Sequence, residues 1–290
     1  MLACSRPELE VVGVTAVWGN HAVEHTADNS LRTLDVIGRS DVPVHAGCDG
    51  PITPRPDLPP AKGSPEPDVL PAPASSRAPA PEGGVEWLVE TARAATQQLT
   101  LVATGSLSNV ASALRADPSL VDAIDEIVVM GGSIDRGGQL PAVETNVRND
   151  PEAAHVVIEA GFGRLVLVPL DATYCASVTS EQCTTLRREG GVAAGLAADY
   201  IEQRIERYRH LPAMAGRAAA PVHDALTIAY LLDPTLVTLR AARVRVESDD
   251  AATRGRTYVE LDPAGDVMVA VDADPERFFE LLLSSLRTLP

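Results

Sequence analysis

Short apolar runs rich in valine, isoleucine and leucine recur along the first two thirds of the chain, with amphipathic stretches between them. The apolar runs lie at residues 9–18, 42–46, 99–104, 126–130 and 164–170. The amphipathic stretches lie at residues 22–37, 85–97, 107–116, 151–160 and 181–186. Strands that are apolar along their whole length and alternate with helices are typical of a parallel sheet buried on both faces. The pattern predicts an α/β fold with an open, mostly parallel sheet flanked by helices.

The pattern changes in the last third of the chain. Helices are predicted at residues 194–210 and 224–232, and a final helix at residues 275–286. Between them, apolar runs at residues 244–247, 257–261 and 267–271 have the length of hairpin strands. Asp150 before Pro151 marks a helix start, because aspartate caps a helix and proline fits its first turn. With 290 residues, 45% of them hydrophobic, we expect one domain over residues 1–290.

Residues 51–84 differ from the rest of the chain because proline and alanine dominate them. Such a segment can bury little apolar surface, so we expect a long, mobile loop on the surface. Long loops in compact domains serve as lids over a binding site or as spacers. Composition does not favour either role here.

Charge and cysteine content restrict the partners and the compartment. The formal net charge is −16 without a basic cluster, which argues against nucleic acids and anionic membranes as partners. No apolar run reaches the length of a membrane-spanning helix, about 18 residues, and no signal peptide is evident. Four cysteines lack the spacing of a zinc site and predict free thiols of a cytoplasmic protein: Cys4, Cys48, Cys175 and Cys183.

Polar residues follow the predicted strands, where α/β sheets bind their ligands. In chain order they include Asn20, Thr104, Glu144, Asn146, Asp171, His223 and Asp224. Each alone has a plainer explanation as a turn residue or helix cap. Together, amides and carboxylates suit a polyhydroxylated ligand, and a histidine can donate a proton near neutral pH. Asp224 and a strand-end carbonyl are oxygen ligands of the kind that calcium or magnesium binds.

The chain resembles the inosine-uridine nucleoside hydrolases over nearly its whole length. The resemblance is carried, in this order, by "SRPELEVVGVTAVWGN", "VATGSLSNVASAL", "EIVVMGGS", "VETNVRNDPEAAHVVIEAG", "VPLDAT" and "PVHDALTIAYLLDP". It implies hydrolysis of the N-glycosidic bond of a ribonucleoside to ribose and free base. It also implies one calcium ion that orients the sugar and a water, and a transition state like an oxocarbenium ion.

The resemblance also implies roles for particular residues. The calcium ligands would be Asp224 and the main-chain carbonyl of Thr104. The ribose contacts would be Asn20, Glu144 and Asn146, and Met130 would line the sugar pocket. His223 would contact the base and protonate the leaving group, and Asp171 would give structural support. Family members often form dimers or tetramers, so a homodimer or homotetramer is expected.

The sequence departs from the family pattern in several places. The signature D-x-D-P-G-x-D-D, which supplies the general base and two calcium-binding carboxylates, is absent together with the first strand. Gly138, Lys62 and Thr145 stand where the family usually has asparagine, histidine and phenylalanine, so the choice of substrate is open. A buried unsatisfied polar group costs about 1–3 kcal/mol, and folded proteins are stable by only about 5–15 kcal/mol. We therefore favour a coding sequence started too late, at an internal methionine, over a true loss of the strand.

Three functions remain as hypotheses. The first is a calcium-dependent ribonucleoside hydrolase of nucleoside salvage, inactive or impaired as the present chain. The second is a ribose or nucleoside binder without catalysis, and the third is a hydrolase of a modified nucleoside or another N-riboside. The preferred base is left open. Tyr208 and Arg204 could approach the base, but we interpret them as solvated residues of a polar helix.

Overall fold

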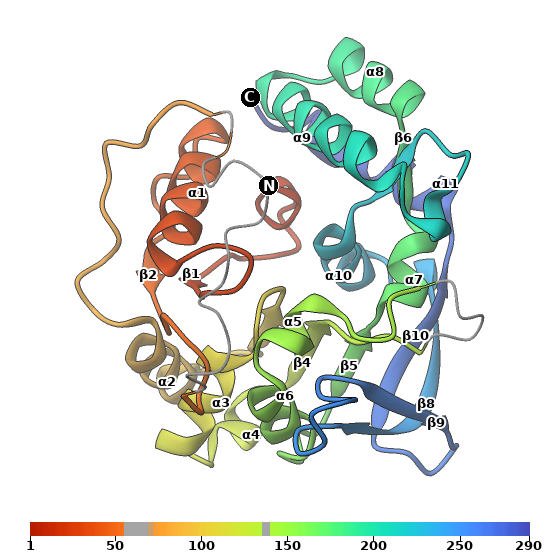
Figure 1. Cartoon of the computed structure of the whole chain (residues 1–290). Helices are drawn as coiled ribbons and strands as arrows, with labels where there is room; N and C mark the ends of the chain where they lie inside the picture. Colours follow the sequence, from red (N-terminus) through yellow and green to blue (C-terminus); the bar gives the residue numbers. More distant parts are fainter. Residues whose placement is uncertain (55–69, 71, 135–139) are drawn as a thin grey trace.

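Six strands form the largest sheet of the computed structural model, which describes residues 1–54, 70, 72–134 and 140–290. Their order across the sheet is β3–β4–β5–β10–β8–β9 (Figure 1). Four neighbouring strands are parallel: β3 (Thr100–Ala103), β4 (Glu126–Met130), β5 (Leu165–Val168) and β10 (Val267–Ala273). β8 (Val237–Val246) and β9 (Thr257–Leu261) continue the sheet as an antiparallel hairpin. The predicted mostly parallel α/β sheet is confirmed.

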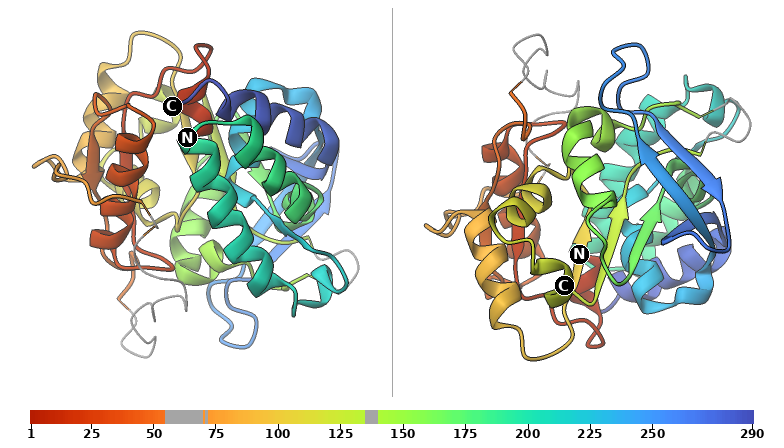
Figure 2. Two further views of the ribbon diagram at one scale, coloured as in Figure 1. Left: turned by 90° about the horizontal axis from the view of Figure 1, so that it is seen from above. Right: turned by 90° about the horizontal axis from the view of Figure 1, so that it is seen from below.

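Helices cover both faces of this sheet, as Figure 2 shows from above and below. Ile127 and Val129 of β4 face one core, whereas Val128 between them faces the other. The first core is closed by α2 (Gly84–Ala94), α3 (Ser108–Ala116), α4 (Leu120–Ala123) and α6 (Pro151–Ile158). The second is closed by α7 (Leu170–Cys175), α8 (Ser180–Glu189), α9 (Val192–Tyr208), α10 (His223–Leu232) and α11 (Pro275–Leu286). Burial on both faces explains why the strands are apolar without alternation.

A second, smaller sheet contains β1 (Val14–Ala16) and β2 (Val44–Ala46), which are parallel and packed with α1 (Val23–Val36). No described residue forms a strand between β1 and β3. The end of β1 contacts α3, because the side-chain amide of Asn109 in that helix donates to the carbonyl of Ala16 at 3.0 Å. Among the described residues, β1 and β2 thus form a sheet separate from the six-stranded one.

Several element bounds differ from the prediction. The run at residues 9–18 yields only the three residues of β1, since this strand pairs with a single neighbour among the described strands. The run at residues 164–170 ends earlier, because Leu170 begins α7. The short elements α5 (Thr145–Asn149), β6 (Ser177–Thr179), β7 (Ala219–Pro221), η1 (Leu2–Ser5), η2 (Pro212–Met214) and η3 (Pro234–Leu236) lack a pattern long enough to predict. In the described part of the chain no helix is long and apolar enough to cross a membrane.

The proline-rich segment lies partly outside the described residues, which omit 55–69 and 71. Its described second half runs along α1. Asp35 accepts hydrogen bonds from Ser75 (2.6 Å) and Arg77 (3.2 Å), and Arg32 donates to the carbonyl of Ala72 (2.8 Å). These contacts attach residues 72–77 to the smaller sheet.

Candidate active site

Three of the predicted site residues meet where β3 and β4 end. The side-chain amide of Asn146 donates to the carbonyl of Thr104 (3.2 Å) and to that of Met130 (3.1 Å). The same nitrogen lies 3.5 Å from the sulfur of Met130. Asn146 is in the short helix α5, which thereby sits across the carboxyl edge of the sheet. The structure thus places Asn146, Thr104 and Met130 in one cluster.

Glu144 caps α5 and is almost fully buried, with 5% of its surface exposed. Its carboxylate accepts main-chain hydrogen bonds from Asn146 (2.8 Å), Val147 (3.1 Å) and Gly132 (3.3 Å). Burial raises the pKa of Glu144 even though these N–H groups favour its charged form, and the nearby charge of Asp224 raises it further. Glu144 therefore shapes the turn between β4 and α5 and lies within electrostatic reach of Asp224.

His223 begins α10 and is held from two sides. Its Nδ1 lies 2.7 Å from the hydroxyl of Thr173, which donates its own proton to the carbonyl of Leu170 (3.2 Å). On the other side of the ring, Nε2 lies 3.4 Å from the hydroxyl of Tyr208, and the tautomer of His223 sets which partner donates in each contact. Burial lowers the pKa of His223 to about 3, and the charge of Arg204 adds to this effect. The imidazole is therefore neutral near neutral pH.

Arg204 and Tyr208 of α9 complete a polar chain that ends on His223. The Arg204 guanidinium donates to the Tyr208 hydroxyl and lies 4.8 Å from the centre of the Tyr208 ring. The interpretation of these two residues as solvated is wrong, because both are partly buried and Tyr208 contacts His223. The ring of Tyr174 packs edge-on against His223 on another side, with 5.6 Å between ring centres.

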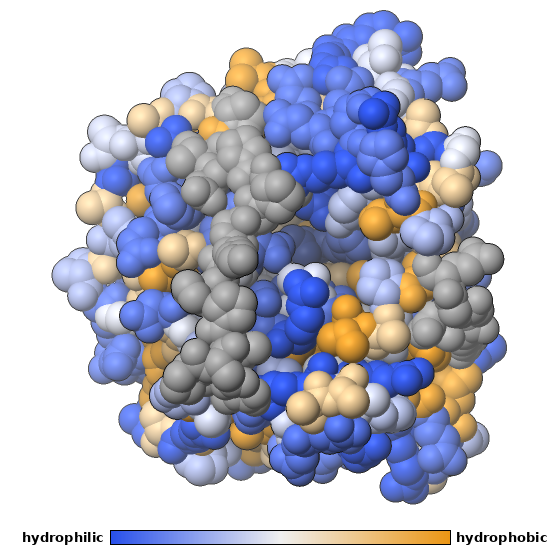
Figure 3. Space-filling model, in the orientation of Figure 1, coloured by the Kyte–Doolittle hydropathy of each residue, from blue (hydrophilic) through white to orange (hydrophobic). Residues whose placement is uncertain are grey.

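Asp224 follows His223 and is exposed. It keeps accessible surface although protein atoms surround it closely. This crowding raises the pKa of Asp224 to about 6, against the opposing charge of Arg204. Figure 3 looks onto a face that is hollowed near its centre and lined there by hydrophilic residues. The exposed carboxylate of Asp224 is open to a small polar ligand.

Asn20 lies after β1 and is exposed. Trp18, two residues before it, is held by hydrogen bonds. The indole N–H of Trp18 donates to the hydroxyl of Ser108 (2.9 Å), and its carbonyl accepts from Ser106 (2.7 Å). The predicted site residues thus come from the ends of β1, β3 and β4 and from the start of α10. Asp171 accepts from the main-chain N–H of Ile134 (2.7 Å), which agrees with its expected supporting role.

Among the described residues there is no group of three histidine, cysteine, aspartate or glutamate side chains placed to hold a metal ion. The carbonyl of Thr104 accepts a hydrogen bond from Asn146, and Asp224 is the single predicted carboxylate ligand. Gly138 and Lys62, where the sequence departs from the family, lie outside the described residues, whereas Thr145 is the first residue of α5.

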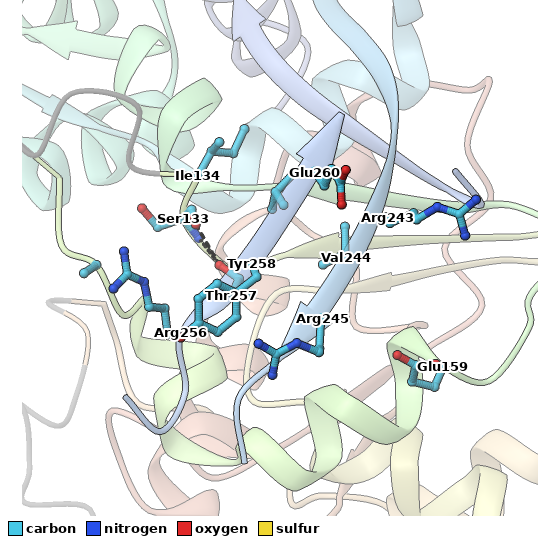
Figure 4. Close-up of a pocket in the computed structure, with 12 residues that line it drawn as sticks. Ser133, Ile134, Glu159, Arg243, Val244, Arg245, Arg256, Thr257, Tyr258 and Glu260 are labelled. Carbon is cyan, nitrogen blue, oxygen red and sulfur yellow. Dashed lines mark hydrogen bonds between the residues drawn. The ribbon is translucent and has the colours of Figure 1, made fainter. Parts of the chain in front are cut away.

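A separate cavity of about 530 Å³ lies against the β8–β9 hairpin (Figure 4). Its lining includes Arg243, Arg245, Arg256 and Tyr258, and none of the predicted site residues. The guanidinium of Arg245 lies 4.4 Å from the centre of the Tyr258 ring. Arg243 and Arg245 are paired with Asp262 and Glu247. This cavity is thus distinct from the candidate site.

Sequence reasoning missed Thr173, Tyr208 and Arg204 as neighbours of His223. Tyr208 and Arg204 are four residues apart and so share one face of α9, which was the available signal. Nothing in the sequence indicates that this face meets α10. Thr173 follows β5 in the stretch "LDAT", so its position after a strand end could have marked it.

Comparisons with known proteins identify the family of the chain. The family model described as inosine-uridine preferring nucleoside hydrolase matches residues 1–280. Pyrimidine-specific ribonucleoside hydrolases RihA of Photobacterium profundum and Citrobacter koseri are 34% and 35% identical to this chain. They align over 99% of it and over 93% and 92% of their own lengths.

Solved structures are also similar. A purine-preferring ribonucleoside hydrolase from Gardnerella vaginalis superposes with a TM-score of 0.83 at 27% identity, covering 99% of this chain and 94% of its own. An inosine-guanosine nucleoside hydrolase gives a TM-score of 0.84 at 26% identity, covering 98% of this chain and 93% of its own. The chain belongs to the inosine-uridine preferring nucleoside hydrolase family, whose members are ribonucleoside hydrolases.

Proposed function

We propose that this protein hydrolyses the N-glycosidic bond of ribonucleosides, with uridine and cytidine as the first substrates to test. The observation that carries the proposal is the polar chain from Arg204 through Tyr208 to His223, beside the accessible carboxylate of Asp224. The pyrimidine preference rests on the names of the RihA relatives, and the purine preference of the Gardnerella enzyme makes inosine the comparison substrate.

The reaction breaks the bond between the anomeric carbon and a base nitrogen. Water contributes its hydroxyl to the carbon and a proton to the base, which leaves as the neutral heterocycle. The departing base gains electrons, so a proton donor or a positive charge near it lowers the barrier. We assign the contact with the base to the Tyr208 hydroxyl and the His223 imidazole, with the positive charge of Arg204 beside them. No described residue is assigned the removal of a proton from water.

Ribose binding is proposed for Asn20, Glu144 and Asn146, with Met130 against the sugar. Glu144 and Asn146 supply acceptor and donor groups at one strand end, which suits a pair of vicinal hydroxyls. Glu144 and Asn146 already form hydrogen bonds within the protein, and these hydrogen bonds fix the orientation of both side chains before a ligand binds. Such preorganisation lowers the entropic cost of binding.

We propose calcium as the metal of this reaction, held in part by Asp224 and the carbonyl of Thr104. Asp224 is the single predicted carboxylate ligand, and carboxylate count sets calcium affinity, so we expect weak calcium binding and slow turnover. The same observation favours a second candidate function, a nucleoside binder without catalysis. Four free thiols agree with a cytoplasmic location, and a homodimer or homotetramer is retained as the proposed assembly.

One experiment separates the two candidates. The chain is incubated with uridine, cytidine or inosine in excess calcium, and released ribose is measured as reducing sugar. Nucleoside binding is measured in parallel by calorimetry. Ribose release that is slower in Tyr208→Phe and is lost on chelation supports the hydrolase. Binding without release supports the binder, and the absence of both contradicts the proposed function.

A further inference from the structure

A buried carboxylate, Asp150, connects several segments that leave the carboxyl ends of the strands. It caps α6 by accepting from the main-chain N–H of Ala153 at 3.1 Å. Its Oδ2 also accepts from the hydroxyl of Ser108 (2.6 Å) and from the main-chain N–H of Ile52 (2.8 Å). Ser108 follows β3, Ile52 follows β2, and Asp150 itself ends α5. The carboxylate is 0% exposed, so water cannot replace these partners.

The connection continues to β1 through a second hydrogen bond. Ser108 gives its proton to Asp150 and accepts the indole N–H of Trp18 at 2.9 Å. Trp18 is buried and lies two residues before Asn20. A methyl group added to Gly19 would sit 3.4 Å from the side-chain nitrogen of Asn149, so this turn packs directly against α5. One network therefore fixes both the turn that carries Asn20 and the helix that carries Asn146.

The chain contains a second helix start of the same sequence, which shows what capping alone requires. Asp150-Pro151-Glu152 begins α6, and Asp274-Pro275-Glu276 begins α11. The Asp274 carboxylate accepts from the N–H groups of Glu276 and Arg277, both at 3.1 Å. Asp150 instead adds two partners that are 42 and 98 residues away in the chain. These long-range bonds exceed what a helix cap needs.

We propose that Asp150 is a positioning residue of the nucleoside site. Acting through Ser108 and Trp18, it sets the distance between Asn20 and Asn146, which approach the ribose from different strand ends. The inference rests on the proposed function, because the two amides matter only if a nucleoside binds between them. An asparagine cannot replace Asp150, since one amide oxygen cannot serve three donors and the amide N–H₂ would face another donor.

The test compares Asp150→Asn with Asp274→Asn, a matched change at the control cap. Ser108→Ala is the second variant, because it cuts the link to Trp18 and leaves the cap of α6 intact. Binding of uridine and inosine is measured by calorimetry. In the absence of nucleoside, ¹⁵N-resolved NMR follows the indole N–H of Trp18, one of two tryptophans, and the side-chain amide of Asn20.

We expect Asp150→Asn and Ser108→Ala to weaken nucleoside binding by roughly tenfold or more, as for one lost charge-assisted hydrogen bond. Both should shift the Trp18 and Asn20 resonances, and Asp274→Asn should change neither. Wild-type binding in the folded Ser108→Ala variant would overturn the inference and leave the proposed function standing. If the unchanged protein binds no nucleoside, the proposed function fails. The inference is then decided by the Asn20 resonance, whose constancy in both variants would overturn it.

Discussion

Glu144 provides a direct test of how the site is built, because the family resemblance makes it a ribose ligand and the structure makes it a helix cap. In Glu144→Ala, three main-chain N–H groups lose their acceptor. Those of Val147 and Gly132 are buried, and that of Asn146 is partly open to water. Each buried unsatisfied N–H costs about 1–3 kcal/mol, which gives about 2–6 kcal/mol for two.

The cost of burying the charge of Glu144 reduces this expected loss of stability. Burial raises the pKa of Glu144, so the folded protein holds its charged form at a cost that alanine removes. We therefore expect Glu144→Ala to lower the free energy of unfolding by about 2–4 kcal/mol. Glu144→Gln keeps one acceptor oxygen and should cost about half as much. The charge that faces Asp224 is lost in both variants.

Urea unfolding at pH 7 measures these changes, provided that the slope with denaturant is unchanged. Thr179→Ala is the control, since Thr179 is an exposed residue that caps α8, and its loss should cost about 1 kcal/mol. Nucleoside binding is measured on the same samples. If Glu144→Ala is as stable as wild type within about 0.5 kcal/mol and still loses binding, the carboxylate serves the ligand and not the turn, and the reasoning is refuted.

Three further outcomes follow from the structure. Tyr208→Phe removes the hydroxyl between Arg204 and His223, so kcat should fall by about tenfold or more while nucleoside affinity changes little; equal kcat values would contradict the proposed relay. Asp35→Asn should cost about 1 kcal/mol at pH 7. Ser75, Arg77 and Ser40 lower the pKa of Asp35, so wild type should lose this advantage as pH falls below about 3.8, in parallel urea titrations. Phe278→Ala, at a fully buried position in the second core, should cost about 3–5 kcal/mol by the same method.

The large elements were predictable because burial leaves a direct mark on the sequence. β4, β9 and α11 have the predicted bounds, since their apolar residues are bounded by clear breaks. Short elements carry too few residues for a period. α5 has five residues and forms because the Glu144 carboxylate accepts its first N–H groups, a contact that no periodicity encodes.

The candidate site was predictable in its residue types and less so in its contacts. Parallel strands bring their carboxyl ends to one edge, so Thr104, Met130 and Asn146 were expected near one another, and they are. The meeting of α9 with α10 depends on how two helices pack over the sheet. The contact of Tyr208 with His223 therefore had no counterpart in the local sequence.

Because the local sequence does not encode contacts between distant elements, a polar residue at a strand end can be interpreted either as a helix cap or as part of the site. Glu144 and Asp150 both cap helices, and both would be dismissed as caps from sequence alone. In the structure, both differ from an ordinary cap such as Asp274. Their carboxylates accept additional hydrogen bonds from residues outside their own helix, whereas the Asp274 carboxylate accepts from the first turn of α11. A cap that also bonds to another strand end cannot move without moving that strand end. In this fold, capping residues at the carboxyl edge therefore belong to the architecture of the site, and their substitution should alter ligand binding together with stability.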